Sequence, residues 1–146
     1  MKKNLLFSLV FLFTALAANA QEWQTDLKTA ENIAQKENKE IILVFQGSDW
    51  CAPCIKLDRE IWSTDKFQDY ASEHYVLLLA DFPRKKKNQL SPEQQEKNKK
   101  LAATYNQQGF FPLVVVLNEK GKVLGKTGYK KTSPEEYIEL LNSFKS

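Results

Sequence analysis

The residues best suited to chemistry in this 146-residue chain are its two cysteines, Cys51 and Cys54, which stand three positions apart with Trp50 before them and Pro53 between them. A spacing of three puts two side chains on one face of a helix, within the Cα separation that a disulfide requires. The apolar run before the pair predicts that Cys51 opens a helix, whose free N–H groups favour a thiolate. Pro53 has no N–H to lose in a first turn and stiffens it. These are the requirements of a dithiol that cycles between reduced and oxidised forms.

Three other uses of a cysteine pair compete with redox chemistry. A zinc site needs four ligands, whereas the chain offers two cysteines and one histidine, His74. A purely structural disulfide that closes so short a loop stabilises a protein by only about 2 kcal/mol, less than longer loops provide. Haem attachment requires a histidine directly after the second cysteine, where this chain has Ile55. Redox use is the favoured interpretation, and we expect no metal or cofactor.

The first twenty residues have the pattern of a secretory signal peptide. The chain begins Met1-Lys2-Lys3, continues with an apolar run over 5–18 and ends this segment in an A-x-A site at 18–20. We expect cleavage after Ala20 and a periplasmic or secreted location, where disulfides can persist; an uncleaved membrane anchor is the alternative. Removing the two lysines lowers the formal net charge from +3 to +1, so no nucleic-acid partner is expected.

Periodicity after residue 20 predicts helices that alternate with buried strands. Helices are expected over 25–38, 52–62, 63–74, 91–105 and 133–144 from their apolar spacing or N-terminal capping signals. Ser91 and Ser133 each begin the pattern of a capping box with proline at the first helical position. Continuous apolar runs predict strands over 41–45, 75–82 and 111–117, and a turn at 118–121 leads to a more polar edge strand over 122–127. A β-α-β half followed by a β-β-α half predicts one domain over 21–146, an α/β fold with a central mixed sheet of four to five strands flanked by helices on both faces.

These motifs and their order resemble the thioredoxin family. The matching residues are Trp50-Cys51-Ala52-Pro53-Cys54 after the strand 41–45, Phe111-Pro112 opening the third strand, and Lys126-Thr127-Gly128 after the hairpin. The chain is similar to exported members of that family, including the C-terminal domain of the bacterial thiol–disulfide interchange protein. The resemblance implies a thioredoxin-like fold and an exported thiol–disulfide oxidoreductase of the protein-disulfide reductase type.

The resemblance also implies roles for the two cysteines. Cys51 would be the attacking thiolate that forms a mixed disulfide with a substrate, and Cys54 would be the resolving thiol. Protein thiols and disulfides would be the substrates of a monomeric enzyme, and a membrane or soluble electron donor would restore the dithiol. The Ala-Pro pair between the cysteines is close to the Gly-Pro of thioredoxins, which favours a reductant over an oxidant.

Four more residues would surround the pair. Pro112 would be a cis-proline facing the sulfurs, with the backbone of Phe111 pairing with bound substrate like an added strand. Trp50 would shield the sulfurs, and Gly128 would allow a close backbone approach. The chain departs from the family at Phe45, where a buried acid commonly handles the proton of the resolving cysteine, and at Phe111, whose bulk predicts narrower access for substrate.

Several features have simpler explanations. Asp49 is expected to be an exposed loop or capping residue rather than a base. The basic runs 84–87 and 97–100 are expected to be solvated faces rather than a docking patch. Phe110 and Phe111 are either a substrate-contacting pair, or one of the two rings is buried in the core.

The alternative function of the whole protein is that of a thioredoxin-fold binding or chaperone-like module whose disulfide is structural.

Overall fold

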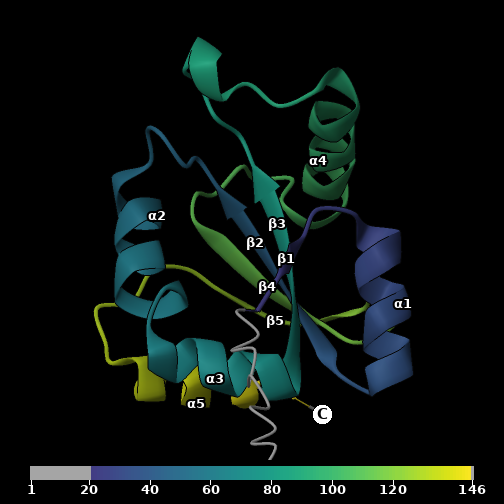
Figure 1. Cartoon of the computed structure of the whole chain (residues 1–146), viewed down its shortest axis with the longest axis vertical. Helices are drawn as coiled ribbons and strands as arrows, with labels where there is room; N and C mark the ends of the chain where they lie inside the picture. Colours follow the sequence, from purple (N-terminus) through teal and green to yellow (C-terminus); the bar gives the residue numbers. More distant parts are fainter. Residues whose placement is uncertain (1–20, 146) are drawn as a thin grey trace, which may run out of the picture.

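A single mixed sheet of five strands forms the centre of the protein (Figure 1). The computed structural model describes residues 21–145, so the predicted signal peptide lies outside the described residues. The strands, in sheet order, are β1 (Trp23–Gln24), β3 (Tyr75–Asp81), β2 (Glu40–Gln46), β4 (Leu113–Leu117) and β5 (Val123–Thr127). The first three are parallel, whereas β4 is antiparallel to β2 and β5 is antiparallel to β4. The predicted mixed sheet is confirmed, with β1 as an additional short strand.

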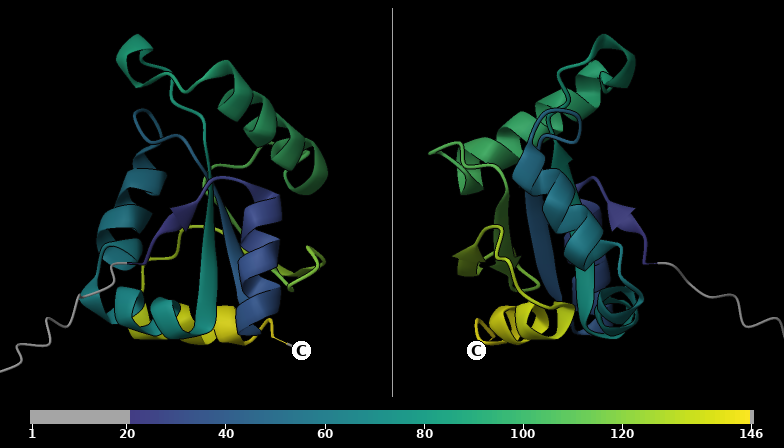
Figure 2. Two further views of the ribbon diagram at one scale, coloured as in Figure 1. Left: turned by 45° about the vertical axis from the view of Figure 1, so that its right-hand side comes forward. Right: turned by 90° about the vertical axis from the view of Figure 1, so that its left-hand side faces the viewer.

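Helices cover both faces of this sheet, as predicted (Figure 2). The helices of one face are α1 (Leu27–Glu37) and α4 (Pro92–Tyr105). Those of the other face are α2 (Ala52–Leu57), α3 (Asp65–His74), α5 (Pro134–Asn142) and the π-helical turn η1 (Asp58–Trp62). None of the helices between residues 21 and 145 is long and apolar enough to span a bilayer.

The side chains of β2 alternate between two buried cores. Ile42 and Val44 pack with η1, α3 and α5, and Ile41, Leu43 and Phe45 pack with α1 and α4. Alternation follows from the strand's period of two, and each such side chain stabilises the fold by roughly 1.5–3 kcal/mol. Because both faces are covered, β2 is apolar along its length, which is why it could be predicted as a buried strand.

The helix predicted over 52–62 is interrupted. It is α-helical to Leu57 and then widens into η1, where the Ser63 N–H donates to the Asp58 carbonyl oxygen at 2.8 Å. This π-helical turn directs Ile61 and Trp62 into the core, where Trp62 is among the largest fully buried side chains. The long core-facing side of the predicted helix is therefore retained although its hydrogen-bond pattern changes.

The strand predicted over 111–117 is β4, and it begins two residues later than predicted, at Leu113. The peptide bond between Phe111 and Pro112 is cis, and Pro112 has no N–H to donate to a neighbouring strand. Pairing with β2 therefore starts at Leu113, opposite Phe45.

The start of α4 differs from the capping box that its sequence predicts. Ser91 accepts the Gln94 N–H at 3.2 Å, but the Gln94 amide donates to the side-chain oxygen of Asn98 at 2.8 Å instead of returning to the cap. Asn98 is almost fully buried and donates to the Asp81 carbonyl oxygen at 2.8 Å. The bond from Asn98 to Asp81 holds α4 against the end of β3.

The parallel strands β2 and β3 end at the same edge, with Gln46 opposite Asp81. Figure 1 shows that the chain leaves β2 toward the start of α2, and leaves β3 toward the 3₁₀ turn η2 (Lys86–Asn88), which projects beyond this edge. The fold thus brings the cysteine pair and the basic segment 84–87 to one end of the molecule.

Candidate redox site

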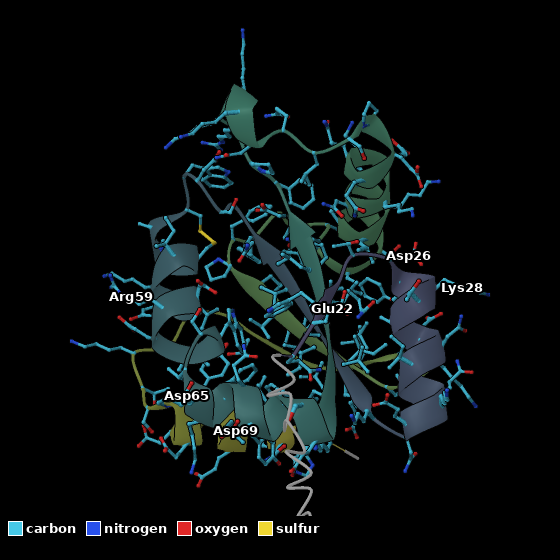
Figure 3. All side chains as sticks on the ribbon, viewed as in Figure 1. Glu22, Asp26, Lys28, Arg59, Asp65 and Asp69 are labelled. Carbon is cyan, nitrogen blue, oxygen red and sulfur yellow. A yellow bond between two sulfur atoms is a disulfide. The ribbon has the colours of Figure 1, made fainter. Side chains whose placement is uncertain are left out.

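Cys51 and Cys54 form a disulfide at the N-terminal end of α2 (Figure 3), with a Cα separation of 5.2 Å. Cys51 is the N-cap residue of α2, and its Sγ accepts the backbone N–H of Cys54 at 3.3 Å. Pro53 occupies the first turn and is exposed. Both cysteines are largely buried, with 4% and 2% of their surface exposed. A thiolate at Cys51 would receive the same N–H as a hydrogen bond, which stabilises the charged form.

A tight turn before the pair is built on Gly47. Its carbonyl oxygen accepts the N–H of Cys51 at 2.9 Å and that of Trp50 at 3.3 Å. A Cβ on Gly47 would overlap the Cε2 and Nε1 atoms of the Trp50 indole. Glycine is therefore required here by the close approach of a ring, and it fixes where Trp50 lies.

Three contacts hold the half-buried Trp50 indole. Its Nε1–H donates to the Phe82 carbonyl oxygen at 2.8 Å, and the Arg84 guanidinium carbon lies 3.7 Å from the ring centroid. The Phe111 ring packs edge-on against Trp50 at a centroid distance of 5.4 Å and against Phe82 at 5.5 Å. The structure thus brings the predicted residues Trp50 and Phe111 together in one aromatic cluster.

The segment before the cis-proline is fixed by a buried amide. Asn106, only 5% exposed, accepts the Phe110 N–H and donates to the Phe110 carbonyl oxygen, both at 2.9 Å. Phe110 itself is 57% exposed, whereas Phe111 is half-buried. One ring of this pair therefore faces solvent and the other packs inside.

Gly128 lies directly beside the cis-proline. A Cβ at Gly128 would stand 3.3 Å from the Pro112 carbonyl oxygen, and the Gly128 carbonyl oxygen accepts the hydroxyl of Tyr137 at 2.8 Å. Tyr137 is fully buried, and burial raises the pKa of its hydroxyl well above the ordinary value, so it remains a neutral donor. This bond ties the segment after β5 to α5.

The surroundings of Cys54 contain a small polar hollow. Phe45, at the position where an acid is usual in the family, is fully buried in the α1–α4 core opposite Ala80. A hollow of about 210 Å³ is lined by Cys54 and by four other residues. These four are Gln46, Ser48, Ile55 and Asp58. Asp58 is the carboxylate among them, one helical turn beyond Cys54.

Asp49 connects the cysteine turn to the segment after β3. Its carboxylate accepts the backbone N–H groups of Arg84 and Lys85 and the side-chain amide of Asn88, each at 2.9 Å. The Arg84 N–H makes the largest contribution, followed by Asn88 and Lys85, and together they lower the pKa of Asp49 to about 2. Asp49 is thus an ionised anchor for a loop more than thirty residues away.

Comparison with known proteins gives a consistent result. Residues 27–145 match the family described as thioredoxin-like domain. The chain belongs to the thioredoxin-like family. It is 35% identical over 127 residues to the disulfide bond reductase DsbH of Chlamydia pneumoniae, which covers 87% of this chain and 74% of that protein.

Two solved structures illustrate the likeness of the fold. The structure of a DsbH oxidoreductase covers 99% of this chain and 94% of its own with a TM-score of 0.79 and 29% identity. The C-terminal domain of Neisseria meningitidis DsbD, in its reduced form, covers 82% and 94% with a TM-score of 0.54 and 22% identity, which supports the fold alone. Family, fold and the Cys51–Cys54 disulfide confirm the prediction of a thioredoxin-like thiol–disulfide oxidoreductase.

Two residues that shape this thioredoxin-like site, Gly47 and Asn106, were not predicted from the sequence, and Asp49 was predicted without its partners. Gly47 and Asn106 show no charge or periodic pattern, and their effect arises from one close contact and two hydrogen bonds. Asp49 was expected to be a loop or capping residue, yet its partners 84–88 could not be identified from sequence.

Within residues 21–145, no three His, Cys, Asp or Glu side chains gather as a metal site requires.

Proposed function

We propose that this thioredoxin-like protein is an exported protein-disulfide reductase that works through the Cys51–Cys54 couple. The observation that carries the proposal is the disulfide at the start of α2, at the same end of the molecule as the exposed Phe110 and the cis Phe111–Pro112 turn. The match to a protein named disulfide bond reductase supports the direction.

The reaction transfers two electrons from the dithiol to a substrate disulfide. The Cys51 thiolate attacks one sulfur of that disulfide, forming a mixed disulfide and releasing the first substrate thiolate. Cys54 then loses its proton and attacks the Cys51 sulfur, which forms the intramolecular disulfide and releases the second substrate thiolate. Both released thiolates take up protons, so a separate electron donor must reduce the protein again after each turnover.

Apolar surface near the couple supports a protein substrate. Ile55, 47% exposed, directly follows Cys54, and Phe110, 57% exposed, precedes the cis-proline turn. Exposed apolar side chains at a site are typical of protein contacts. We assign the backbone of Phe111 to pairing with an extended substrate segment, with Trp50 and Gly128 as the borders of this surface.

The proton of Cys54 requires an acceptor other than the side chain at position 45, because Phe45 cannot accept it. The polar hollow that Cys54 shares with Asp58 provides one. We assign Asp58 as the group that receives this proton, directly or through water that enters the hollow. A carboxylate in this position acts as a general base when Cys54 attacks.

Residues 1–20 are proposed to be a cleaved signal peptide, which would leave a single domain over 21–146. When a bacterial cell expresses the full chain, its envelope fraction should contain the protein with Gln21 as the N-terminal residue. Recovery of the uncleaved chain in the cytoplasmic fraction would contradict export without affecting the redox chemistry.

The cysteine roles are tested with single substitutions. A Cys54→Ser variant should accumulate protein mixed disulfides on Cys51 that dissolve on addition of dithiothreitol, whereas Cys51→Ser should accumulate none. Equilibration with glutathione should give a reduction potential nearer to about −270 mV, the value of thioredoxin, than to about −120 mV, the value of a strong oxidant. Failure of the protein to reduce any disulfide would favour the alternative of a binding module with a structural disulfide.

A further inference from the structure

The basic segment after β3 is a fixed part of the redox end. Its four consecutive cations are Arg84, Lys85, Lys86 and Lys87, which we call the basic wall. Asp49, two residues before Cys51, receives three hydrogen bonds from 84–88 at 2.9 Å. A loop held by both oxygens of an ionised carboxylate keeps its backbone position relative to the cysteine turn.

Arg84, the first residue of the basic wall, contacts the aromatic cluster next to the disulfide. The Arg84 guanidinium stacks on Trp50 at 3.7 Å, and Trp50 precedes Cys51 and packs on Phe111. This stacking places a positive charge beside the tryptophan that borders the site. A substrate segment that approaches Cys51 along Trp50 would meet Arg84 first, and the three lysines follow Arg84 in the chain.

The charges of the basic wall are available to a partner. Lys85, Lys86 and Lys87 are exposed, and among residues 21–145 no carboxylate comes within 4.0 Å of the cationic nitrogens of residues 84–87. Asp49, the carboxylate that holds this loop, accepts hydrogen bonds from backbone and side-chain amide donors. The Arg84 N–H contributes most to the lowered pKa of Asp49, and of the charges in the basic wall only that of Lys85 contributes. The second basic run differs, because Lys97 pairs with Asp26 at 3.3 Å and with Glu93 at 3.2 Å.

We propose that the basic wall selects substrates: the preferred disulfides lie in protein segments with acidic residues beside the target cysteine. This inference rests on the proposed reductase function and specifies its substrate class. The formal net charge is +3 for the whole chain and +1 without Lys2 and Lys3, so a preference for acidic segments must come from locally positioned charge. It also changes the sequence-based expectation for 84–87, which was a solvated loop without a partner.

The size of the preference follows from screening. Locally focused charge raises association rates by about 10- to 1000-fold at low salt. At about 20 mM salt the Debye length is roughly 20 Å, and at about 0.5 M it is below roughly 5 Å. An acidic peptide should therefore react at least about tenfold faster than a basic one at low salt, and the ratio should approach one at high salt.

The assay uses three synthetic peptides that each carry one cysteine as a 2-thiopyridyl disulfide, flanked by Glu, Gln or Lys. The reduced protein attacks the peptide sulfur and releases pyridine-2-thione, which is followed by absorbance; Cys54 then releases the peptide thiol. The uncharged 2,2′-dithiodipyridine reports the intrinsic reactivity of the dithiol. Stopped-flow rates are compared at the two salt concentrations.

Two triple variants with the same change of net charge separate the basic wall from the rest of the surface. Lys85→Gln, Lys86→Gln and Lys87→Gln together should remove most of the preference for the Glu-flanked peptide. The control replaces three exposed lysines at the opposite end of the sheet and should retain the preference. These are Lys36, Lys120 and Lys122. Both triple variants should react with 2,2′-dithiodipyridine at the rate of the unmodified protein.

Asp49→Ala distinguishes two explanations of the preference for acidic peptides: the net charge of this end of the molecule, or the fixed position of the basic wall. Removing a carboxylate makes the redox end more positive, so a preference set by net charge would increase. Removing the Asp49 carboxylate also frees residues 84–88. If the position of the basic wall sets the preference, the ratio of the rates for the Glu-flanked and Lys-flanked peptides should fall at least twofold, with each rate normalised to that with 2,2′-dithiodipyridine. An increase would overturn the proposal.

The other outcomes are equally distinct. Equal rates for the three peptides, or loss of the preference in both triple variants, would overturn the role of the basic wall while leaving the reductase function intact. Absence of any reaction with 2,2′-dithiodipyridine would instead contradict the reductase function. Binding of the protein to vesicles containing anionic lipid through residues 84–87, with no discrimination among peptides, would assign the wall to a membrane surface and refute the substrate proposal.

Discussion

Gly47→Ala is expected to destabilise the oxidised protein although it adds only one methyl group. The backbone of Gly47 is fixed because its carbonyl oxygen accepts the N–H of Cys51 and that of Trp50. The new Cβ would overlap the Trp50 indole, so the ring has to leave its place.

The cost can be estimated from the contacts that Trp50 loses. The hydrogen bond to the Phe82 carbonyl oxygen contributes about 1 kcal/mol, the edge-on packing with Phe111 about 0.5–1.5 kcal/mol, and the stacked Arg84 about 0.5–1 kcal/mol. We therefore expect the free energy of unfolding to fall by about 2–3 kcal/mol, since partial relaxation of the ring recovers some of the loss.

A double-mutant cycle isolates the ring from the backbone. Urea unfolding of the oxidised protein gives the cost of Gly47→Ala in the unmodified chain and in a Trp50→Ala background. Without the ring, Gly47→Ala should cost less than about 1 kcal/mol, because the remaining effect is that of the backbone and the unfolded chain. The coupling energy between Gly47 and Trp50 is then at least about 1 kcal/mol.

An equal cost in both backgrounds would refute this reasoning and show that Gly47 is required by the backbone of the turn. Gly125→Ala is a matched control, because a Cβ there would overlap the ring of Phe144, far along the chain from the disulfide. It should destabilise the protein while leaving the reaction of the dithiol with 2,2′-dithiodipyridine unchanged.

Three other predictions concern the same end of the molecule. Asp58→Asn should slow release of the peptide thiol by about tenfold, while the first attack keeps its rate, because only the deprotonation of Cys54 loses its acceptor; equal slowing of both steps would contradict this. Asn106→Ala should lower the free energy of unfolding by about 1–3 kcal/mol, the value of two hydrogen bonds to the Phe110 backbone, as measured in urea. Asp49 has its pKa lowered to about 2, so the stability it contributes is complete above pH 4 and is lost as the pH falls from about 4 to 2. In urea unfolding, the free energy of unfolding of Asp49→Asn should therefore change less over that pH window than that of the unmodified protein. The same pH dependence in both proteins would contradict the assignment.

Much of the fold was predictable because its signals are local. The continuous apolar strand over 41–45 and the capping residue Ser133 are readable within a few residues. The strand β1 was missed because two residues, Trp23 and Gln24, carry no periodicity and pair only once β3 is in place. The predicted capping box at Ser91 failed for a similar reason, since the Gln94 side-chain amide donates to the Thr25 carbonyl oxygen, which lies beside it only in the folded protein.

The candidate site was predictable in part. Cys51 and Cys54 define their own chemistry, because their spacing and the proline between them act within one helical turn. The contact between Trp50 and Phe111 joins residues some sixty positions apart, and only the family resemblance suggested that they would lie together. The acceptor for the Cys54 proton was not predictable, because Phe45 removes the usual signal.

Most helices and strands and the redox cysteines could be identified from the sequence, because periodicity and spacing act over a few residues, and the motifs around Cys51 and Pro112 carried the resemblance to the family. The tertiary structure alone decided what surrounds the disulfide. The carboxylate of Asp49 holds a loop that follows another strand, and Arg84 of that loop lies on Trp50. These contacts exist because parallel strands β2 and β3 end at the same edge of the sheet, which turns a basic run of the sequence into a wall of the site.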